Sequence, residues 1–411
     1  MTINDNEQKE SKNILFLTLL DFSSLDEKNI YTDLLREIRR HGNKIYVVSP
    51  SERKNKNRTH IIKEHNSVIL KLRIGNIQKT NIIEKGISTV LIEPQFKKAI
   101  RKYFNSIKFD LVLYSTPPIS FVDAVKYVKD RDSAKSYLLL KDIFPQNAVD
   151  IGMMSTSGIK GLLYRFFRKK EKELYEISDR IGCMSPANIR YLLSNNHKID
   201  SSIVELCPNS IEPVDKSVDD YARKALRTKY KIPLDKTVLV YGGNLGKPQG
   251  IPFLIDCLRA CKDIQNAFFI IVGDGTEFHL IKEYIHLEQP KNVRLIKRLP
   301  KEDYDAMVGA CDVGLIFLDH RFTIPNFPSR LLSYMQAKLP VLACTDTHTD
   351  VGKVIVDGGF GWWCESNDVL GFVELVENCL SEDCSSKGRI GYEYLLKHYT
   401  VENAYNTIIA E

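Results

Sequence analysis

The chain has 411 residues, a formal net charge of +6 at pH 7 and nine cysteines, and its mean hydropathy is −0.22. This length exceeds one typical domain, so two domains with full cores are expected. The small positive charge suits phosphate or anionic lipid but is too small to indicate a nucleic-acid partner.

The sequence shows no strong pattern for a membrane span, a signal peptide or disulfide bonds. No apolar run approaches the roughly eighteen residues of a membrane span, and the polar N-terminus predicts no signal peptide. The cysteines are scattered and form no C-x-x-C pair, which is typical of buried thiols in a reducing compartment. We therefore expect a cytoplasmic protein, and residues 1–12 are predicted to be a disordered tail.

Buried strands alternate with helices along the first half. Apolar runs predict strands at ILFLTLL, IYVVS, VILKLRI, LVLYST, YLLLKD, IGCM and IVELC, and a helix over residues 26–41 that ends at Gly42. This alternation is typical of a doubly wound parallel sheet. The basic stretch of residues 51–57 is predicted to be a loop, either solvated or in contact with a charged acceptor.

Residues 159–180 form a helical pattern in which apolar and basic side chains are interleaved: IKGLLYRFFRKKEKELYEISDR. Such a helix can lie on an anionic membrane surface. The alternative is an ordinary amphipathic helix packed on the sheet, with its charges in solvent.

The second half repeats the β-α pattern after a break at residues 206–220 (LCPNSIEPVDKSVDD). Strands are expected at VLVYGG, AFFIIVG, VRLIKR, VGLIFL, PVLAC and GWWCE. The predicted boundaries are an N-terminal domain at 13–212, a C-terminal domain at 213–395 and a final helical segment at 396–411.

Residues 312–344 carry the strongest signal for a ligand site. A buried strand, VGLIFL, is followed by a polar loop, a helix expected from about Pro328, and a further strand, PVLAC. A loop and helix start at the carboxyl edge of a parallel sheet present free N–H groups to phosphate.

Four stretches in order resemble glycosyltransferase family 4: LCPNSIEP, VLVYGGNLGKPQG, FFIIVGDG and PSRLLSYMQAKLPVLA. The last resembles the family's nucleotide-sugar segment, P-S-K-x-x-E-x-M-A-x-G-x-P-V. The N-terminal half resembles the family more loosely, through LYSTPP and KDIFPQNAVDIG.

The resemblance implies an α/β GT-B fold. Two Rossmann-like doubly wound domains would face each other across a cleft, and a C-terminal helix would cross back to the first domain. It implies a retaining transferase that uses a UDP-sugar. The similarity to the family's L-fucosamine-type branch implies that the transferred sugar is an N-acetylated amino sugar. The expected acceptor is a lipid-linked saccharide of a bacterial surface polysaccharide, such as a capsule or O-antigen. Peripheral contact with the inner membrane would run through residues 159–180.

Departures from the family pattern concern the donor site. In the family, an arginine stands two residues after the glycine of Y-x-G-R, and a lysine stands five residues further on. In this chain those two positions are Asn244 and Gln249. Lys247, Arg298 and Arg330 are therefore the candidate cations for the diphosphate, each with a surface charge as the alternative.

The family's paired glutamates fall on Pro325 and Ser333, which predicts altered donor choice or lost activity. Gly242 and Gly243 would let backbone approach the diphosphate. The complete set of donor-binding candidates is Gly242, Gly243, Asn244, Arg298, Asn326, Ser329, Arg330, Leu331 and Ser333.

In the first domain, Asp142 ends a predicted strand and could orient the acceptor hydroxyl, with a helix cap as the alternative role. Asp142, Arg330 and Lys247 are the candidate catalytic residues. The acceptor-binding candidates are Ser23, Ser24, Thr116, Pro117 and Lys141. The serines could instead cap the following helix.

No metal or other cofactor is expected. Asp130-Arg131-Asp132 and Asp303-Tyr304-Asp305 both match D-x-D, but each falls in a helical or exposed context. Two other functions remain open: a nucleotide-sugar epimerase of the same fold, and a catalytically silent partner subunit that binds nucleotide sugar.

Overall fold

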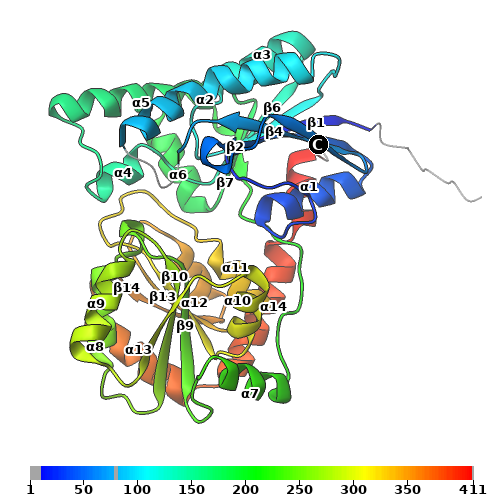
Figure 1. Ribbon diagram of the computed structural model, residues 1–411. Helices are drawn as coiled ribbons and strands as arrows, with labels where there is room; N and C mark the ends of the chain where they lie inside the picture. The colour runs from blue at the N-terminus through cyan, green and yellow to red at the C-terminus, as the bar shows by residue number, and fades with distance from the viewer. Residues whose placement is uncertain (1–10, 78–81, 410–411) are drawn as a thin grey trace, which may run out of the picture.

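The computed structural model describes residues 11–77 and 82–409, so most of the predicted tail lies outside the described residues. Two lobes each contain one sheet with helices on both faces (Figure 1). The strand orders are β3-β4-β2-β1-β5-β6-β7-β8 in the first lobe and β11-β10-β9-β12-β13-β14 in the second. The expected two-domain doubly wound α/β architecture is confirmed.

The strands of the first sheet are β1 (Asn13–Leu17), β2 (Lys44–Glu52), β3 (His60–Glu64), β4 (Ser67–Ile74), β5 (Leu111–Ser115), β6 (Lys135–Leu140), β7 (Arg180–Cys183) and β8 (Val204–Leu206). Those of the second are β9 (Thr237–Asn244), β10 (Ala267–Asp274), β11 (Val293–Lys297), β12 (Val313–Phe317), β13 (Val341–Thr345) and β14 (Gly361–Glu365).

The helices of the first half are α1 (Ile30–Arg40), α2 (Ile82–Tyr103), α3 (Val122–Asp132), α4 (Gln146–Asp150), α5 (Gly158–Ile177) and α6 (Pro186–Asn195). Those of the second half are α7 (Asp220–Lys229), α8 (Ile251–Ala260), α9 (Phe278–Glu288), α10 (Lys301–Gly309), α11 (Arg330–Gln336), α12 (Val351–Asp357), α13 (Val369–Ser381), α14 (Cys384–His398) and α15 (Val401–Ile409). Short 3₁₀ turns are η1 (Arg53–Asn55), η2 (Ser201–Ile203) and η3 (Lys247–Gln249).

The first sheet is buried on both faces because its central strands are almost entirely apolar. Helices α2, α3 and α5 cover one face, around Phe96, Phe121 and Leu174. On the other face, α1 packs together with α15, which supplies Tyr405 and Ile408. The last helix of the chain thus completes the core of the first domain.

The second sheet is likewise enclosed. Helices α8, α9 and α13 pack on one face, while α11, α12 and part of α14 pack on the other. All pairings in this sheet are parallel, so the carboxyl ends of its strands meet at one edge, where such sheets bind ligands.

The chain crosses between the lobes twice, and the two crossings pair with each other. Ile211 N donates to the Tyr399 carbonyl at 2.9 Å and Val401 N donates to the Ile211 carbonyl at 3.2 Å. The returning element is α15 alone: α14 runs through residues 395 and 396, so the final segment predicted at 396–411 begins inside a helix of the second lobe.

Several predicted element bounds were wrong. The first helix begins at Ile30 instead of residue 26, because Asn29 is the N-cap and accepts from Tyr31 N and Thr32 N at 3.0 Å each. The helix expected from Pro328 begins at Arg330. Strand β3 was not predicted at all, because its side chains are partly or fully exposed on an antiparallel edge strand.

Candidate functional site

The candidate donor site lies where the strand order of the second sheet reverses. The chain starts in the middle of the sheet with β9, adds β10 and β11 on one side, and then returns to place β12 on the other side. The crevice between the carboxyl ends of β9 and β12 is the position where open α/β sheets bind nucleotides. The loops that border it are residues 242–250 and 318–329, and the second leads directly into α11.

Gly243 and Arg330 meet across this crevice. Gly243 has φ +135°, and a Cβ atom there would lie 3.0 Å from Arg330 Nη2. At Gly242 a Cβ would lie 1.9 Å from the Tyr304 hydroxyl. Both glycines are therefore required by close approach, and the guanidinium of Arg330 lies directly against the bend that ends β9.

A cage of tyrosines surrounds Arg330. Its Cζ lies 4.5 Å from the ring centroid of Tyr241, and Tyr334 and Tyr304 are also close enough to interact with it. The Tyr334 hydroxyl accepts from Gly242 N at 3.2 Å, which fixes the bend. Burial raises the pKa of Tyr334 to about 12, so this ring is neutral at physiological pH.

Arg330 Nη1 is buried and has no hydrogen-bond partner within the described part of the chain. Buried polar groups are nearly always paired, and an unpaired guanidinium N–H is a donor available to an anion. Sequence reasoning missed the tyrosines: Tyr304 comes from α10, and Tyr334 carried no signal beyond its place in the SRLLSYM run.

Asn244 and Gln249, which stand where two cations were expected, bond to each other. Asn244 Nδ2 donates to Gln249 Oε1 at 3.0 Å, and Gly246 N donates to the same oxygen at 3.3 Å. The two positions thus form a neutral amide pair that closes the loop. Lys247 is exposed in the same loop, at the start of η3.

Arg298 follows β11 at the edge of the sheet and is exposed. β11 is two strands from β9, which is about 10 Å at ordinary strand spacing. The structure therefore does not bring Arg298 into contact with the Gly243–Arg330 pair, and its predicted role stays a prediction.

The other donor-binding candidates divide into two groups. Asn326 N donates to Thr349 Oγ1 at 2.9 Å, while Asn326 Nδ2 is buried without a partner. Ser333 is partly exposed on α11. Leu331 is fully buried in the core, and its predicted donor contact stays a prediction. The Ser329 side chain makes no capping bond within the described part of the chain.

Asp142 follows β6 at the carboxyl edge of the first sheet, next to Thr116 at the end of β5. Its carboxylate accepts from Ile143 N and Asn147 Nδ2, each at 2.8 Å. Burial raises the pKa of Asp142 to about 6, despite these two hydrogen bonds. Pro145 is the N-cap of α4 and no described side chain caps that helix, so Asp142 does not have the helix-cap role considered as the alternative. Its carboxylate is poised near neutral pH.

Two acceptor-binding candidates are occupied by contacts within the protein. The Thr116 hydroxyl accepts from Lys141 N at 3.0 Å and Asp142 N at 3.1 Å, and it donates to the Asp142 carbonyl at 2.9 Å. Lys141 Nζ donates to the Pro208 carbonyl at 3.3 Å, and burial lowers the pKa of Lys141. Thr116 therefore holds the turn that carries Asp142, and the acceptor contacts expected of Thr116 and Lys141 stay predictions. Pro117, next to them, is exposed.

Ser23 and Ser24 lie in the loop after β1. Ser24 Oγ accepts from Asp26 N at 3.0 Å, whereas Ser23 N donates to Glu27 Oε1 at 2.7 Å. Since Asn29 caps α1, neither serine has the capping role considered as the alternative. Lys71 holds this loop from beneath: its buried Nζ bonds to the Phe22 carbonyl at 2.8 Å and Ser49 Oγ at 3.0 Å.

The two sites face each other because the loop before α11 packs against the first domain. Leu318, Phe322 and Ile324 form an apolar cluster with Ile143 and Ile151. This cluster links the turn that carries Asp142 to the loop that leads to Arg330.

Polar contacts reinforce this closure. Thr323 N and Oγ1 donate to Asp150 at 2.7 and 2.9 Å, and Asn188 Nδ2 donates to the Pro325 carbonyl at 2.9 Å. Pro325, at the position of a family glutamate, thus contacts the opposite domain through its backbone. Sequence reasoning missed all of these contacts.

Three of the four carboxylates in the D-x-D matches are engaged in ion pairs, and the fourth, Asp130, is exposed. Asp303 and Asp305 pair with Lys229 at 2.9 Å and Lys216 at 2.8 Å, and Asp132 pairs with Arg131 at 2.6 Å. These carboxylates stabilise helix contacts and belong to neither of the two facing crevices.

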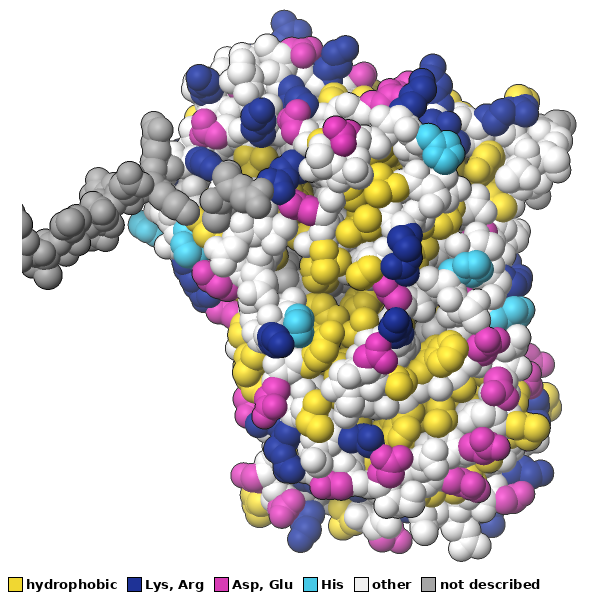
Figure 2. All heavy atoms as spheres, turned by 180° about the vertical axis from the view of Figure 1, so that it is seen from behind, with side chains coloured by type: hydrophobic (Ala, Val, Ile, Leu, Met, Phe, Trp, Pro, Cys, Tyr) yellow, Lys and Arg dark blue, Asp and Glu magenta, His cyan; other side chains and the backbone are white. Residues whose placement is uncertain are grey.

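Next to the crossings, both lobes line a cavity of about 300 Å³. Its walls include Met184 and Cys207 of the first domain, Phe327 and Val354 of the second, and Tyr399 at the end of α14. Seen from behind, apolar side chains gather in the hollow between the two lobes (Figure 2).

Residues 222–395 match the model of the family Glycosyl transferases group 1. The chain is 24% identical over 328 residues to the probable glycosyltransferase WbjE of Pseudomonas aeruginosa, covering 78% of each protein. It is 23% identical over 133 residues, 32% of each chain, to the putative colanic acid biosynthesis glycosyl transferase WcaI of Escherichia coli (strain K12).

Among solved structures, sucrose-phosphate synthase from Thermosynechococcus elongatus superposes with a TM-score of 0.75 at 14% identity, covering 97% of both chains. HepE of Anabaena, solved in complex with UDP-glucose, gives a TM-score of 0.69 at 14% identity, covering 97% of this chain and 98% of that one. The fold is therefore GT-B, and the sequence similarities support a glycosyltransferase.

Proposed function

We propose that the protein is a retaining glycosyltransferase that transfers a sugar from a UDP-sugar to a lipid-linked saccharide in bacterial surface polysaccharide synthesis. The favoured donor is an N-acetylated amino sugar, in keeping with the resemblance in PSRLLSYMQAKLPVLA. The relative WcaI is a putative colanic acid biosynthesis glycosyl transferase, which supports a polysaccharide pathway, and the UDP-glucose complex of HepE supports a UDP-linked donor.

The observation that carries the proposal is Arg330 Nη1 at the sheet's reversal point, which is buried and has no hydrogen-bond partner among residues 11–77 and 82–409. Departure of UDP leaves negative charge on the diphosphate, which fixed donors can stabilise without reorganising. Arg330 supplies a planar fork for two phosphate oxygens. Gly243, whose backbone bends beside it, allows the diphosphate to approach.

Asp142 has a separate role in the proposal. Its carboxylate would orient the acceptor hydroxyl across the cleft, while the leaving phosphate takes the proton in a retaining transfer. The turn that carries Asp142 is held by Thr116 and by the apolar cluster with the loop before α11.

No metal is assigned a role in the proposal, because fixed cations and N–H groups can hold the diphosphate and three of the four D-x-D carboxylates are already paired with lysine or arginine. Turnover that is unchanged after EDTA treatment is the expected result. Loss of turnover in EDTA that Mn²⁺ restores would contradict this part of the proposal.

Helix α5 supports contact with the inner face of the cytoplasmic membrane. Leu162, Leu163 and Phe166 are 60%, 50% and 46% exposed, and Arg165 and Lys169 are exposed beside them. An amphipathic helix packed only on its own sheet would bury such side chains; exposed together, they suit an anionic lipid surface. No helix among residues 11–77 and 82–409 is long and apolar enough to span a bilayer.

The first experiment is a thermal-shift screen of the full chain with UDP, GDP and their sugars, followed by UDP-release assays with an acceptor extract. Stabilisation by UDP and by a UDP-N-acetylhexosamine, but not by GDP, is expected. Donor conversion without acceptor would instead indicate the epimerase.

A silent binding subunit is the second candidate, favoured by the neutral Asn244–Gln249 pair and by Pro325 in place of a glutamate. Stabilisation by UDP combined with no UDP release from any donor, in the presence of acceptor extract, would identify it.

A further inference from the structure

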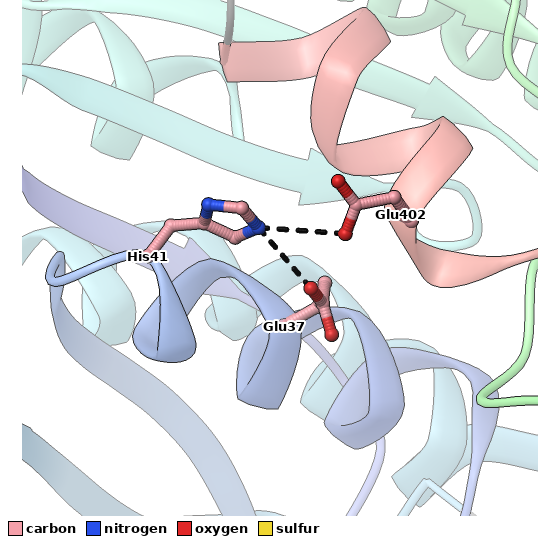
Figure 3. Close-up of side chains that lie close together, drawn as sticks. All are labelled: Glu37, His41 and Glu402. Carbon is pink, nitrogen blue, oxygen red and sulfur yellow. Dashed lines mark hydrogen bonds and ion pairs between the residues drawn. The ribbon is translucent and has the colours of Figure 1, made fainter.

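Three side chains with metal-binding atoms meet where the last helix packs on the first domain (Figure 3). Glu37 and His41 lie one turn apart on α1, and Glu402 projects from the start of α15. Both carboxylates point at the same ring nitrogen. His41 Nε2 lies 3.2 Å from Glu37 Oε1 and 3.4 Å from Glu402 Oε2.

These separations match the edges of a metal coordination polyhedron. A tetrahedral zinc ion about 2.0–2.1 Å from nitrogen and oxygen ligands requires those ligands to lie about 3.3 Å apart. The ligand atoms of Glu37, His41 and Glu402 all lie within 4.8 Å of one another. One ring nitrogen carries at most one proton, so a proton can satisfy only one of the two carboxylates fully, whereas a dication can satisfy both.

These three residues and the charged side chains around them carry a net negative charge that a dication would balance. Four carboxylates and two guanidinium groups contact one another here, which gives a net charge of −2 with neutral histidine. The members are Asp33, Glu37, Glu212, Glu402, Arg36 and Arg40. The arginines contact Asp33, Glu37 and Glu212, and Glu402 pairs with neither of them.

Each ligand is also held in place by a further residue. Arg40 Nη1 donates to Glu37 Oε2 at 2.9 Å, which leaves Oε1 free to face the histidine. The His41 ring stacks on Tyr405 with centroids 3.8 Å apart and planes 10° apart. The Asn406 side chain is a hydrogen-bond partner of Glu402. Such supporting contacts orient ligands in metal sites.

We propose that Glu37, His41 and Glu402 bind a divalent transition metal of the zinc class, with water completing its coordination. An imidazole with two carboxylates suits zinc and disfavours magnesium and calcium, which prefer oxygen ligands alone. The metal would join α15 to α1 and so fix the returning helix to the first domain. The inference does not depend on the proposed transferase activity.

The test is zinc titration of the full-length, chelator-treated protein against a chromophoric chelator. One equivalent of zinc should bind, and His41→Gln and Glu402→Gln should each weaken binding at least about tenfold, since even supporting residues of metal sites contribute roughly 10–100-fold. His279→Gln is the matched control, because His279 is exposed and bonds only to the Thr276 carbonyl among the contacts described.

Hydrogen exchange locates the effect. Zinc should slow amide exchange in α15 of the wild-type protein and of His279→Gln, but not in His41→Gln or Glu402→Gln. Absence of stoichiometric binding, or equal affinity in the wild type and both ligand variants, would overturn the proposal. Glu402 and His41 both lie partly in solvent, so neither substitution should prevent folding.

Discussion

Replacing Arg330 tests the proposed donor site most directly. In Arg330→Ala the guanidinium is removed from its place between Tyr241 and Gly243, and the diphosphate loses a planar pair of donors. In Arg330→Lys the charge remains, but a single ammonium replaces the fork. Both variants should be impaired, because geometry contributes as well as charge.

The magnitude follows from what Arg330 contacts. A charge-assisted hydrogen bond contributes roughly 1.5–3 kcal/mol, so kcat/KM should fall about ten- to over a hundredfold in Arg330→Ala. Loss of the cation–π contact with Tyr241, whose centroid is 4.5 Å away, should cost about 1–2 kcal/mol of folding stability. The free energy of unfolding and kcat/KM should therefore both decrease, and the free-energy loss calculated from kcat/KM should be the larger of the two.

The assay is UDP release together with calorimetric UDP binding, with the unfolding temperature measured in parallel. Arg259→Ala is a matched control, since this exposed arginine of the same domain pairs with Asp256 and Glu288 and lies over the Tyr284 ring, as Arg330 lies over that of Tyr241. Wild-type kcat/KM and UDP affinity in a folded Arg330→Ala protein would refute the reasoning and transfer the role to Lys247.

Three further predictions concern other parts of the molecule. Burial raises the pKa of Asp142 to about 6, so its carboxylate is ionised above that pH and protonated below it. Turnover should therefore fall towards acid with a midpoint near pH 6. In a pH–rate profile, Asp142→Asn should show low activity without this midpoint. Glu212→Gln removes the charge that Arg36 and Arg40 share, which should lower the unfolding temperature by about 2–4 °C per kcal/mol lost; an unchanged calorimetric trace would show that the ion pairs contribute nothing. Phe166→Asp should reduce co-sedimentation with anionic vesicles while UDP affinity stays at the wild-type value, and equal sedimentation of both proteins would exclude α5 as the contact.

Much of the fold could be predicted because it depends on local patterns. The apolar run VGLIFL became β12, and the break at LCPNSIEP became the first crossing between lobes. Edge strand β3 had no such pattern, since HIIKE is largely exposed. The start of α11 was misplaced by two residues, because Pro328 suits a first helical turn but lies in the preceding loop.

The site was predicted less well because it depends on contacts between distant segments. Arg330 and Gly243 could be selected from motifs, yet the tyrosine cage required Tyr304 from a different helix. The sequence also did not indicate that the Thr116 hydroxyl bonds to the 141–142 turn. The pairing of Asn244 with Gln249 depends on how η3 folds, which periodicity does not specify.

The place of α15 has a consequence for how the chain is made. The first domain closes its core with Val401, Tyr405, Ile408 and Ile409, so during synthesis that apolar face stays uncovered until α15 has been made. A fragment ending at residue 212 should therefore be prone to aggregation. Adding residues 396–411 as a separate peptide should restore its solubility. The core of the first domain is therefore completed only after the residues of the second domain have been made.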